Sequence, residues 1–225
     1  MLVHYLEDSR AHRILWLLEE LGVEYEVKRY KRGENMSAPA ELRRIHPLGK
    51  SPVIEDDGHV VAESAAIVEY IIDRYGRDSG LRPEPGTDEA LRYRYWMNYS
   101  EGSAMPLLVM KLVFQKIPEQ APWLLKPLMK RISKAVTATL TDPQLKTHGA
   151  FWESELQRDG WFAGPNFTAA DIMMSFPIET GMERIAFEQR PHALVEFLQK
   201  IHARSAYRQA LQRGGAYRYG GNPMS

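Results

Sequence analysis

Gly49-Lys50-Ser51-Pro52-Val53 and Glu63-Ser64-Ala65-Ala66-Ile67 flank an Asp-Gly turn, and this arrangement at residues 49–67 is the most informative feature of the chain. The apolar runs on either side of Asp57-Gly58 predict a tight hairpin with strands at 53–55 and 59–62. A proline at the mouth of a strand donates no ladder hydrogen bond, and with a cis bond before Pro52 the N–H and C=O of Ser51 face outward. An extended ligand is therefore expected to pair with the backbone of Ser51.

The second strand of this hairpin leads to the start of a helix predicted at residues 65–75. A helix start presents unpaired N–H groups and the positive end of the helix dipole, so a ligand carboxylate is expected to dock at Ser64. Glu63, its neighbour, is suited to receive an ammonium group. Together with Ser51, these residues predict a site for the backbone and carboxylate of a small peptide.

The composition narrows the class of protein. Lys plus Arg and Asp plus Glu each number 29, so no global field favours nucleic acid or an acidic membrane. The chain has no cysteine, and any sulfur nucleophile must arrive with a substrate. The sequence has no run of about 20 apolar residues, no secretory leader pattern and no metal-ligand, esterase or phosphate-loop motif. We expect a cytoplasmic protein without a metal.

Periodicity along the chain predicts two differently built halves. Strands at 2–6 and 24–30 flank a helix at 11–21 that ends at Gly22, a helix at 39–45 follows, and the hairpin and its helix complete the order βαβ then ββα, the thioredoxin-like arrangement. Residues 81–88 are rich in proline and glycine, which interrupt helices and strands, and they predict a linker between the two halves. Helical periodicity alone follows at 89–114, 123–140, 147–159, 169–183 and 191–213. Residues 214–225 are expected to form a mobile tail, with a lid over a site as the alternative.

These motifs resemble the glutathione transferase family, in which a residue before a cis-proline and an acidic or amide residue followed by serine hold the tripeptide. Ser51 and Glu63 have the family's spacing. The run from His46 to Lys50 resembles the family's Asn-Pro-Leu-Gly-Lys loop with His in place of Asn. Thr168-Ala169-Ala170-Asp171 resembles the buried capping box of its helical domain.

The resemblance covers nearly the whole chain and implies a cytosolic, serine-type, bacterial-like member. The implied fold is an α+β thioredoxin-like N-terminal domain at residues 1–80, the linker at 81–88, and an all-α helical-bundle C-terminal domain at 89–225. The implied function is detoxification by a homodimeric enzyme that conjugates the glutathione thiolate to a small hydrophobic electrophile. Two alternatives stay open: glutathione-dependent peroxidase activity at the same site, and a non-catalytic glutathione-binding regulatory protein. The lack of cysteine opposes a disulfide reductase.

Ser9 lies in the loop between the first strand and the first helix and matches the position at which serine-type members donate a hydroxyl hydrogen bond to the glutathione sulfur. We predict that Ser9 is the catalytic residue; the alternative is that it only caps the helix. Tyr5 is the rival donor, because tyrosine-type members use a phenol near the end of this strand. Its position in the alternation favours packing inside the sheet.

The resemblance implies further contacts to glutathione. Lys50 matches lysines that meet the glycyl carboxylate, and His46 is expected to reach the same group or to brace its loop. Arg13 is expected either to reach the ligand or to form a salt bridge inside the domain. The second-substrate pocket is expected on the first long helix of the second half, with core packing as the alternative for each residue. Its predicted lining residues are Tyr99, Ser103, Met105 and Met110.

The basic residues Lys126, Lys130, Arg131 and Lys134 have a spacing typical of a solvated helix face. No partner is predicted for them.

Overall fold

The computed structural model describes residues 1–33, 37–215 and 217–220 of the chain. Within these residues the strands β1 (Leu2–Leu6), β2 (Glu26–Tyr30), β3 (Val53–Asp56) and β4 (His59–Ala62) form one four-stranded sheet in the order β2-β1-β3-β4. β1 and β2 are parallel, whereas β1 with β3 and β3 with β4 are antiparallel.

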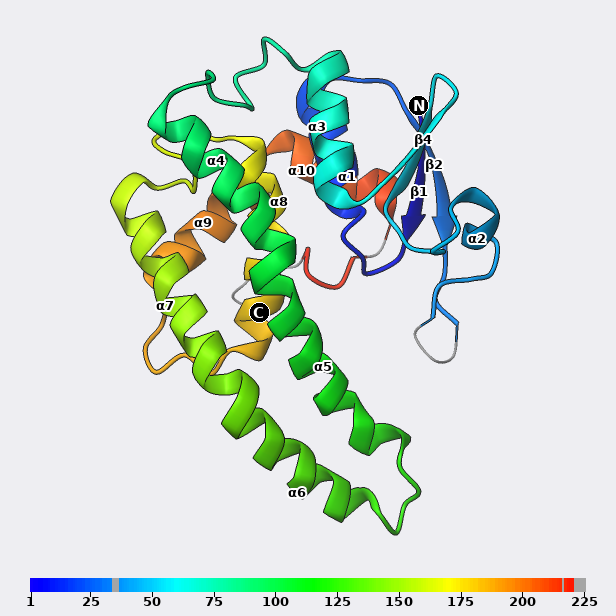
Figure 1. The fold of residues 1–225 in the computed structure, drawn as a ribbon, viewed down its shortest axis with the longest axis vertical. Helices are drawn as coiled ribbons and strands as arrows, with labels where there is room; N and C mark the ends of the chain where they lie inside the picture. Colours follow the sequence, from blue (N-terminus) through cyan, green and yellow to red (C-terminus); the bar gives the residue numbers. More distant parts are fainter. Residues whose placement is uncertain (34–36, 216, 221–225) are drawn as a thin grey trace.

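Three helices belong to the sheet: α1 (His12–Leu21), α2 (Leu42–Ile45) and α3 (Ser64–Tyr75). α1 and α3 cover one face of the sheet, and α2 lies on its other side (Figure 1). The order βαβ then ββα confirms the predicted thioredoxin-like arrangement.

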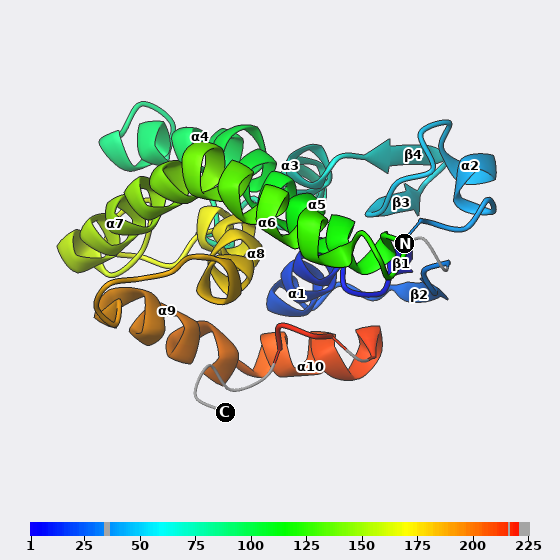
Figure 2. The same cartoon turned by 90° about the horizontal axis from the view of Figure 1, so that it is seen from below.

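The rest of the chain is helical in its described part. Its helices are α4 (Asp88–Tyr99), α5 (Met105–Gln120), α6 (Lys126–Val136), α7 (Asp142–Asp159), α8 (Ala169–Arg184), α9 (His192–Ala203) and α10 (Ser205–Gly214). Two π-helical turns, η1 (Ser100–Ala104) and η2 (Thr137–Thr141), join α4 to α5 and α6 to α7, so these pairs form two long antiparallel rods. The rods run beside α8 at the centre of the bundle (Figure 2).

Local sequence explains the best-predicted elements. Asp57 and Gly58 both have positive φ, 48° and 77°, which is the backbone of the tight hairpin turn that the Asp-Gly pair predicts. Gly22 ends α1 in the left-handed conformation with φ 63°, and its N–H bonds to the Glu19 carbonyl. At the start of α8, Asp171 accepts hydrogen bonds from the Thr168 N–H at 2.7 Å and the Phe162 N–H at 2.8 Å. The predicted capping box is therefore present.

Several predicted helix ends are wrong. The helix expected at 39–45 is helical only from Leu42. The helix expected from Thr147 begins at Asp142, because Pro143 lies in its first turn, where proline fits without losing a hydrogen bond. The helix expected at 191–213 is two helices, since the chain is extended at Arg204.

The C-terminal residues 217–220 are packed against the bundle, which differs from the mobile tail that the composition predicts. Tyr217 is only 9% exposed, and its hydroxyl donates to the buried Glu179 carboxylate at 2.6 Å. The backbone N–H of Arg218 donates to Asp8 Oδ1 at 2.8 Å, beside Ser9. Residues 216 and 221–225 of the predicted tail lie outside the described residues.

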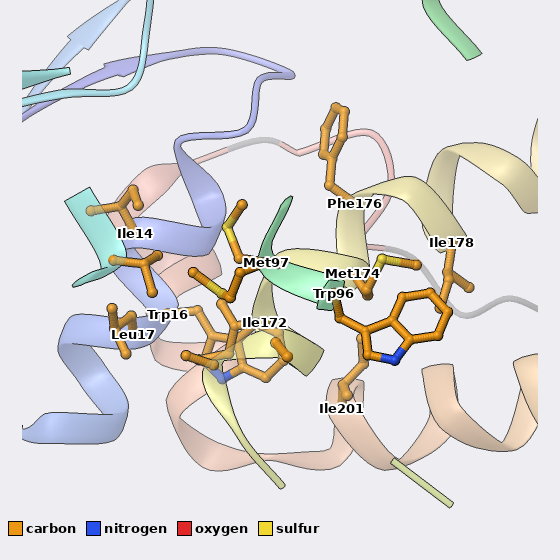
Figure 3. Packing of buried hydrophobic residues seen from close by; sticks show 14 of the residues in the cluster. Ile14, Trp16, Leu17, Trp96, Met97, Ile172, Met174, Phe176, Ile178 and Ile201 are labelled. Carbon is orange, nitrogen blue, oxygen red and sulfur yellow. The ribbon is translucent and has the colours of Figure 1, made fainter. Parts of the chain in front are cut away.

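A single apolar core joins the sheet side to the helical bundle. Ile14, Trp16 and Leu17 of α1 lie near Met97 and Ile172, and Trp96 lies near Met174 farther into the bundle (Figure 3). Trp16, Trp96 and Trp152 are each almost completely buried. Burial of such large side chains is the main source of stability. Because α1 belongs to this core, it is held between the sheet on one side and the helical bundle on the other.

His12 makes the stability of this core depend on pH. Its ring is buried, stacks on Tyr217 with ring centroids 4.5 Å apart, and has no hydrogen-bond partner for either nitrogen among the described residues. Burial, together with the charge of His202, lowers the pKa of His12 from 6.5 to about 3. The unfolded chain therefore binds a proton between these pH values that the folded chain does not bind.

We expect His12→Phe to unfold with a weaker acid dependence than the wild type. Below pH 6.5 the wild type should lose up to about 1.4 kcal/mol of unfolding free energy per pH unit relative to the variant, because only the wild type carries the buried imidazole. Urea unfolding followed by tryptophan fluorescence at a series of pH values measures this difference. Parallel pH profiles for the two proteins would contradict the prediction.

Candidate active site

Ser51 lies where the antiparallel pairing of β1 with β3 stops. The ladder ends at His4 opposite Val53, and Pro52 after the cis peptide bond has no N–H to continue it. The Ser51 hydroxyl takes over: it donates to the His4 carbonyl at 2.9 Å and accepts from the Leu6 N–H at 3.1 Å. These side-chain bonds fix the loop before β3 to the end of β1.

Glu63 and Ser64 lie where β4 passes into α3, as predicted. Glu63 is exposed and has φ 72°, a left-handed conformation that is uncommon for a residue other than glycine and is often found at functional sites. Ser64 is buried, and its hydroxyl oxygen accepts a hydrogen bond from Arg13 Nη2 at 3.0 Å. The backbone thus turns Glu63 toward solvent while Ser64 is tied to α1.

Ser9 lies in the loop between β1 and α1, and is 6% exposed. Its hydroxyl oxygen accepts from the Ala11 N–H at 3.2 Å, a contact within the turn that precedes α1, whose N-cap residue is Ala11 and has no side-chain cap. A hydroxyl that accepts one bond still has its own proton to donate. The observed contact therefore leaves the hydroxyl proton of Ser9 free, and the catalytic role of Ser9 stays a prediction.

Tyr5 lies inside the structure rather than at the site. It is 1% exposed, and its hydroxyl has no hydrogen-bond partner among the described residues. Burial, followed by the negative charge of Asp8, raises the pKa of its phenol above the usual value. Core packing of Tyr5 is confirmed.

Lys50 and His46 lie in the loop between α2 and β3. Lys50 is exposed, and His46 is half-buried with no partner for Nδ1 among the described residues. Both residues precede Ser51 in this loop, and the exposed side chain of Lys50 is the one that a ligand bound along the loop can reach.

Arg13 forms the internal salt bridge that was one of its two predicted roles. Its side chain is completely buried and pairs with the Glu101 carboxylate, and its Nη1 donates to the Met173 carbonyl at 2.7 Å. Arg10 Nε lies 2.9 Å from the other carboxylate oxygen of Glu101. Arg13 therefore joins α1 to η1, to α8 and, through Ser64, to the start of α3.

Glu101 is the site-region residue that the sequence interpretation missed. Burial alone would raise its pKa, but the positive charges of Arg13 and Arg10 and their hydrogen bonds outweigh burial and lower the pKa below the usual value. No local pattern marks this residue, because its partners lie on α1 and in the loop before it, 88 positions away for Arg13. Only the tertiary fold reveals the pairing.

The four residues of the predicted second-substrate pocket do not come together. Tyr99 and Ser103 line a hollow of about 930 Å³ between α4, the start of α5 and α7, where His148 also lies. The Tyr99 hydroxyl bonds to His148 and accepts from Trp152 Nε1 at 2.9 Å. Met105 is buried in the core, whereas Met110 is 42% exposed on α5, and neither lines that hollow.

Comparison with known proteins places this geometry in a family. Residues 1–73 match the family description "Glutathione S-transferase, N-terminal domain". The chain is 32% identical to glutathione S-transferase 1 of Saccharomyces cerevisiae over 224 residues, which is 95% of each chain. The chain belongs to the glutathione S-transferase family. The predicted enzyme class and fold class are thereby confirmed for this family member.

Further similarities agree with the assignment. Glutathione S-transferase 3 of Schizosaccharomyces pombe is 32% identical over 95% of this chain and 87% of its own length. The crystal structure of a glutathione S-transferase from Actinobacillus pleuropneumoniae is 30% identical, with a TM-score of 0.78 over 97% of this chain and 94% of that one. A sphingomonad glutathione S-transferase complexed with glutathione is 23% identical and has a TM-score of 0.72 over 96% of this chain and 99% of that one.

We expect Glu101→Gln to destabilise the fold by about 2–3 kcal/mol, because it leaves the buried Arg13 cation without a counter-charge. The matched control is Glu119→Gln, which removes an exposed pair with Lys116 and should change the unfolding free energy by less than about 1 kcal/mol. Chemical denaturation of the three proteins measures both effects.

The same pair has a predicted pH dependence. Because the pKa of Glu101 is lowered in the folded state, the ion pair stabilises the fold fully above pH 4.5, the ordinary pKa of a glutamate. This stabilisation is lost as the pH falls through the folded-state pKa. Equal destabilisation by both variants at neutral pH would show that Arg13 does not depend on Glu101.

Proposed function

We propose that this family member binds glutathione in the loops around Ser51 and Ser64, lowers the pKa of its thiol through Ser9, and directs the thiolate onto a small hydrophobic electrophile. The observation that supports this site is the convergence of three loops. Ser51 is bonded to Leu6 at the end of β1, Ser64 is bonded to Arg13 on α1, and Ser9 lies between β1 and α1. A peptide that pairs with Ser51 would therefore extend toward both other serines.

Each end of the tripeptide has a partner of suitable charge in this proposal. The free backbone of Ser51 pairs with the peptide, Glu63 receives the ammonium, and the start of α3 at Ser64 holds the neighbouring carboxylate. Lys50, with His46 behind it, meets the glycyl carboxylate. Arg13 acts as a positioning residue, because its guanidinium is already bound to Ser64, Glu101 and Met173.

The chemistry needs no nucleophile from the protein, which has no cysteine. Lowering a thiol pKa by about two units stabilises the thiolate by about 2.7 kcal/mol, and one hydrogen bond to a charged group contributes about 1.5–3 kcal/mol. The Ser9 hydroxyl proton is available for such a bond. The thiolate sulfur then forms a bond to the electrophilic carbon, and the electron pair of the broken bond leaves with the departing group.

We propose residues 1–80 and 89–225 as the two domains with 81–88 as linker, a cytoplasmic location, a detoxifying role and a homodimer. Leu91 and Tyr95, 66% and 48% exposed on α4, are apolar surface that a second copy could cover.

Among the described residues there is no cluster of three or more His, Cys, Asp and Glu suited to a metal.

The peroxidase and regulatory alternatives would use the same loops. A peroxidase would send the thiolate onto a hydroperoxide oxygen instead of a carbon, and a regulatory protein would bind glutathione without activating it. An aryl halide and an organic hydroperoxide, assayed as second substrates, separate the two reactions.

We expect Ser9→Ala to lower turnover about 100-fold while glutathione affinity stays within about threefold, because the variant loses a bond made to the thiolate and keeps the peptide contacts. Calorimetry gives the affinity, and the ultraviolet absorbance of the bound thiolate between pH 5 and pH 9 gives the thiol pKa. Ser154→Ala, on the exposed face of α7, is the matched control.

The outcomes of this experiment separate the candidate functions. An unchanged rate in Ser9→Ala would assign the hydrogen bond to another donor. Glutathione binding without a thiolate signal in the wild type would favour the regulatory protein, and no binding would reject the proposed site.

A further inference from the structure

The hairpin formed by α5 and α6 projects away from the sheet and from the rest of the bundle (Figure 1). Trp123, Leu124 and Leu125, which we call the hairpin tip, lie at its end and are 78%, 69% and 50% exposed. Three adjacent large apolar side chains with this exposure are unusual on a protein surface unless they bind something.

The apolar surface continues from the tip along α6. Leu128 and Ile132, one helical turn apart, are 55% and 45% exposed. The side of α6 that packs on α5 is a different one, because its buried residues are Ser133 and, just beyond the helix, Thr137. On α6 the inward side carries Ser133 together with the half-buried Met129 and Val136, and the large side chains of Leu128 and Ile132 are left in solvent, where an ordinary surface helix carries polar residues.

A basic row flanks this apolar surface. It consists of Lys126, Lys130, Arg131 and Lys134. None of the four forms an ion pair with any described residue, and residues 121–141 contain no Asp or Glu. The chain as a whole has equal numbers of acidic and basic residues, so this excess of positive charge is local to the hairpin.

We propose that the hairpin tip and the basic row bind reversibly to the surface of an anionic lipid bilayer. A tryptophan beside leucines is suited to the interface between headgroups and acyl chains, and lysine and arginine next to them attract anionic headgroups. A second copy of the chain fits less well, because pairing the two apolar surfaces would bring two basic rows together.

This binding is peripheral. No helix in the described part of the chain is apolar over enough length to span a bilayer. We expected no membrane partner because the numbers of acidic and basic residues are equal. Equal totals do not show that the basic residues of one hairpin lack acidic partners.

The test is sedimentation of the full chain with vesicles of phosphatidylcholine alone and vesicles with equal parts of phosphatidylserine. We expect binding to the anionic vesicles only, weakened by salt, with a shift of Trp123 emission to shorter wavelength. Trp123→Ser with Leu124→Ser, and separately Lys126→Glu with Lys130→Glu, should each lower the vesicle partition coefficient at least about tenfold.

Matched controls separate these effects from general changes of surface. Leu140→Ser removes an exposed apolar residue at the base of the hairpin. Lys146→Glu with Lys200→Glu changes the net charge equally on α7 and α9. Both controls should bind as the wild type does, and circular dichroism should show that every variant is folded.

Three outcomes would overturn the proposal: no binding to anionic vesicles, equal and salt-insensitive binding to both kinds of vesicle, or equal loss in the hairpin variants and the controls. Tip-dependent self-association in size-exclusion chromatography, without vesicle binding, would assign the surface to a second copy. Capture of an acidic protein through the tip, again without vesicle binding, would assign it to a protein partner.

Discussion

The buried guanidinium of Arg13 is the interaction on which the arrangement of the molecule depends. A fully buried cation is costly unless acceptors compensate its charge, and here the acceptors of the two terminal nitrogens of Arg13 come from three separate elements. Glu101 belongs to the turn between α4 and α5, the Met173 carbonyl to α8, and Ser64 to the start of α3. The sheet side and the helical side therefore share one polar contact, surrounded by the apolar core of Trp16, Trp96 and their neighbours.

A second polar contact shapes the loop that the proposed ligand would use. Because Pro52 cannot donate to β1, the Ser51 hydroxyl supplies both a donor and an acceptor to the end of that strand. The side chain of Ser51 is thus used for the fold, and its backbone is left for a ligand. Ser64 is similar, since its hydroxyl accepts from Arg13 while its position in the first turn of α3 leaves backbone donors near the site. In both serines the structural and the proposed binding roles belong to different atoms.

The acidic and basic residues of this protein are unevenly distributed, although their total numbers are equal. Near Ser9, Arg10 and Arg13 share the single carboxylate of Glu101, so most of the charge in this cluster is paired and one positive charge is left over. On the α5–α6 hairpin, four basic residues form no ion pair with a described residue, and they lie beside an apolar surface that the described part of the chain leaves exposed. A net charge of zero therefore describes neither region, and the sites differ because burial strengthens pairing in one and solvent screens the charges in the other.

Features that depend on neighbours along the chain can be predicted from the sequence. The Asp57-Gly58 turn, the end of α1 at Gly22 and the capping box at Asp171 follow from local backbone preferences, and the βαβ then ββα order follows from them. The start of α7 differs from the prediction, since Pro143 lies in the first turn of this helix and not before it.

Contacts between residues that are far apart in the chain follow from the three-dimensional packing and not from local sequence. It paired Glu101 with Arg13 and Arg10, buried Tyr217 against Glu179, and separated Met105 and Met110 from the hollow at Tyr99. It also showed that α6 directs Leu128 and Ile132 to solvent and Ser133 inward, although periodicity alone shows only that the helix has two unlike faces. Periodicity defines the faces of a helix, but the packing of other elements decides which face is covered.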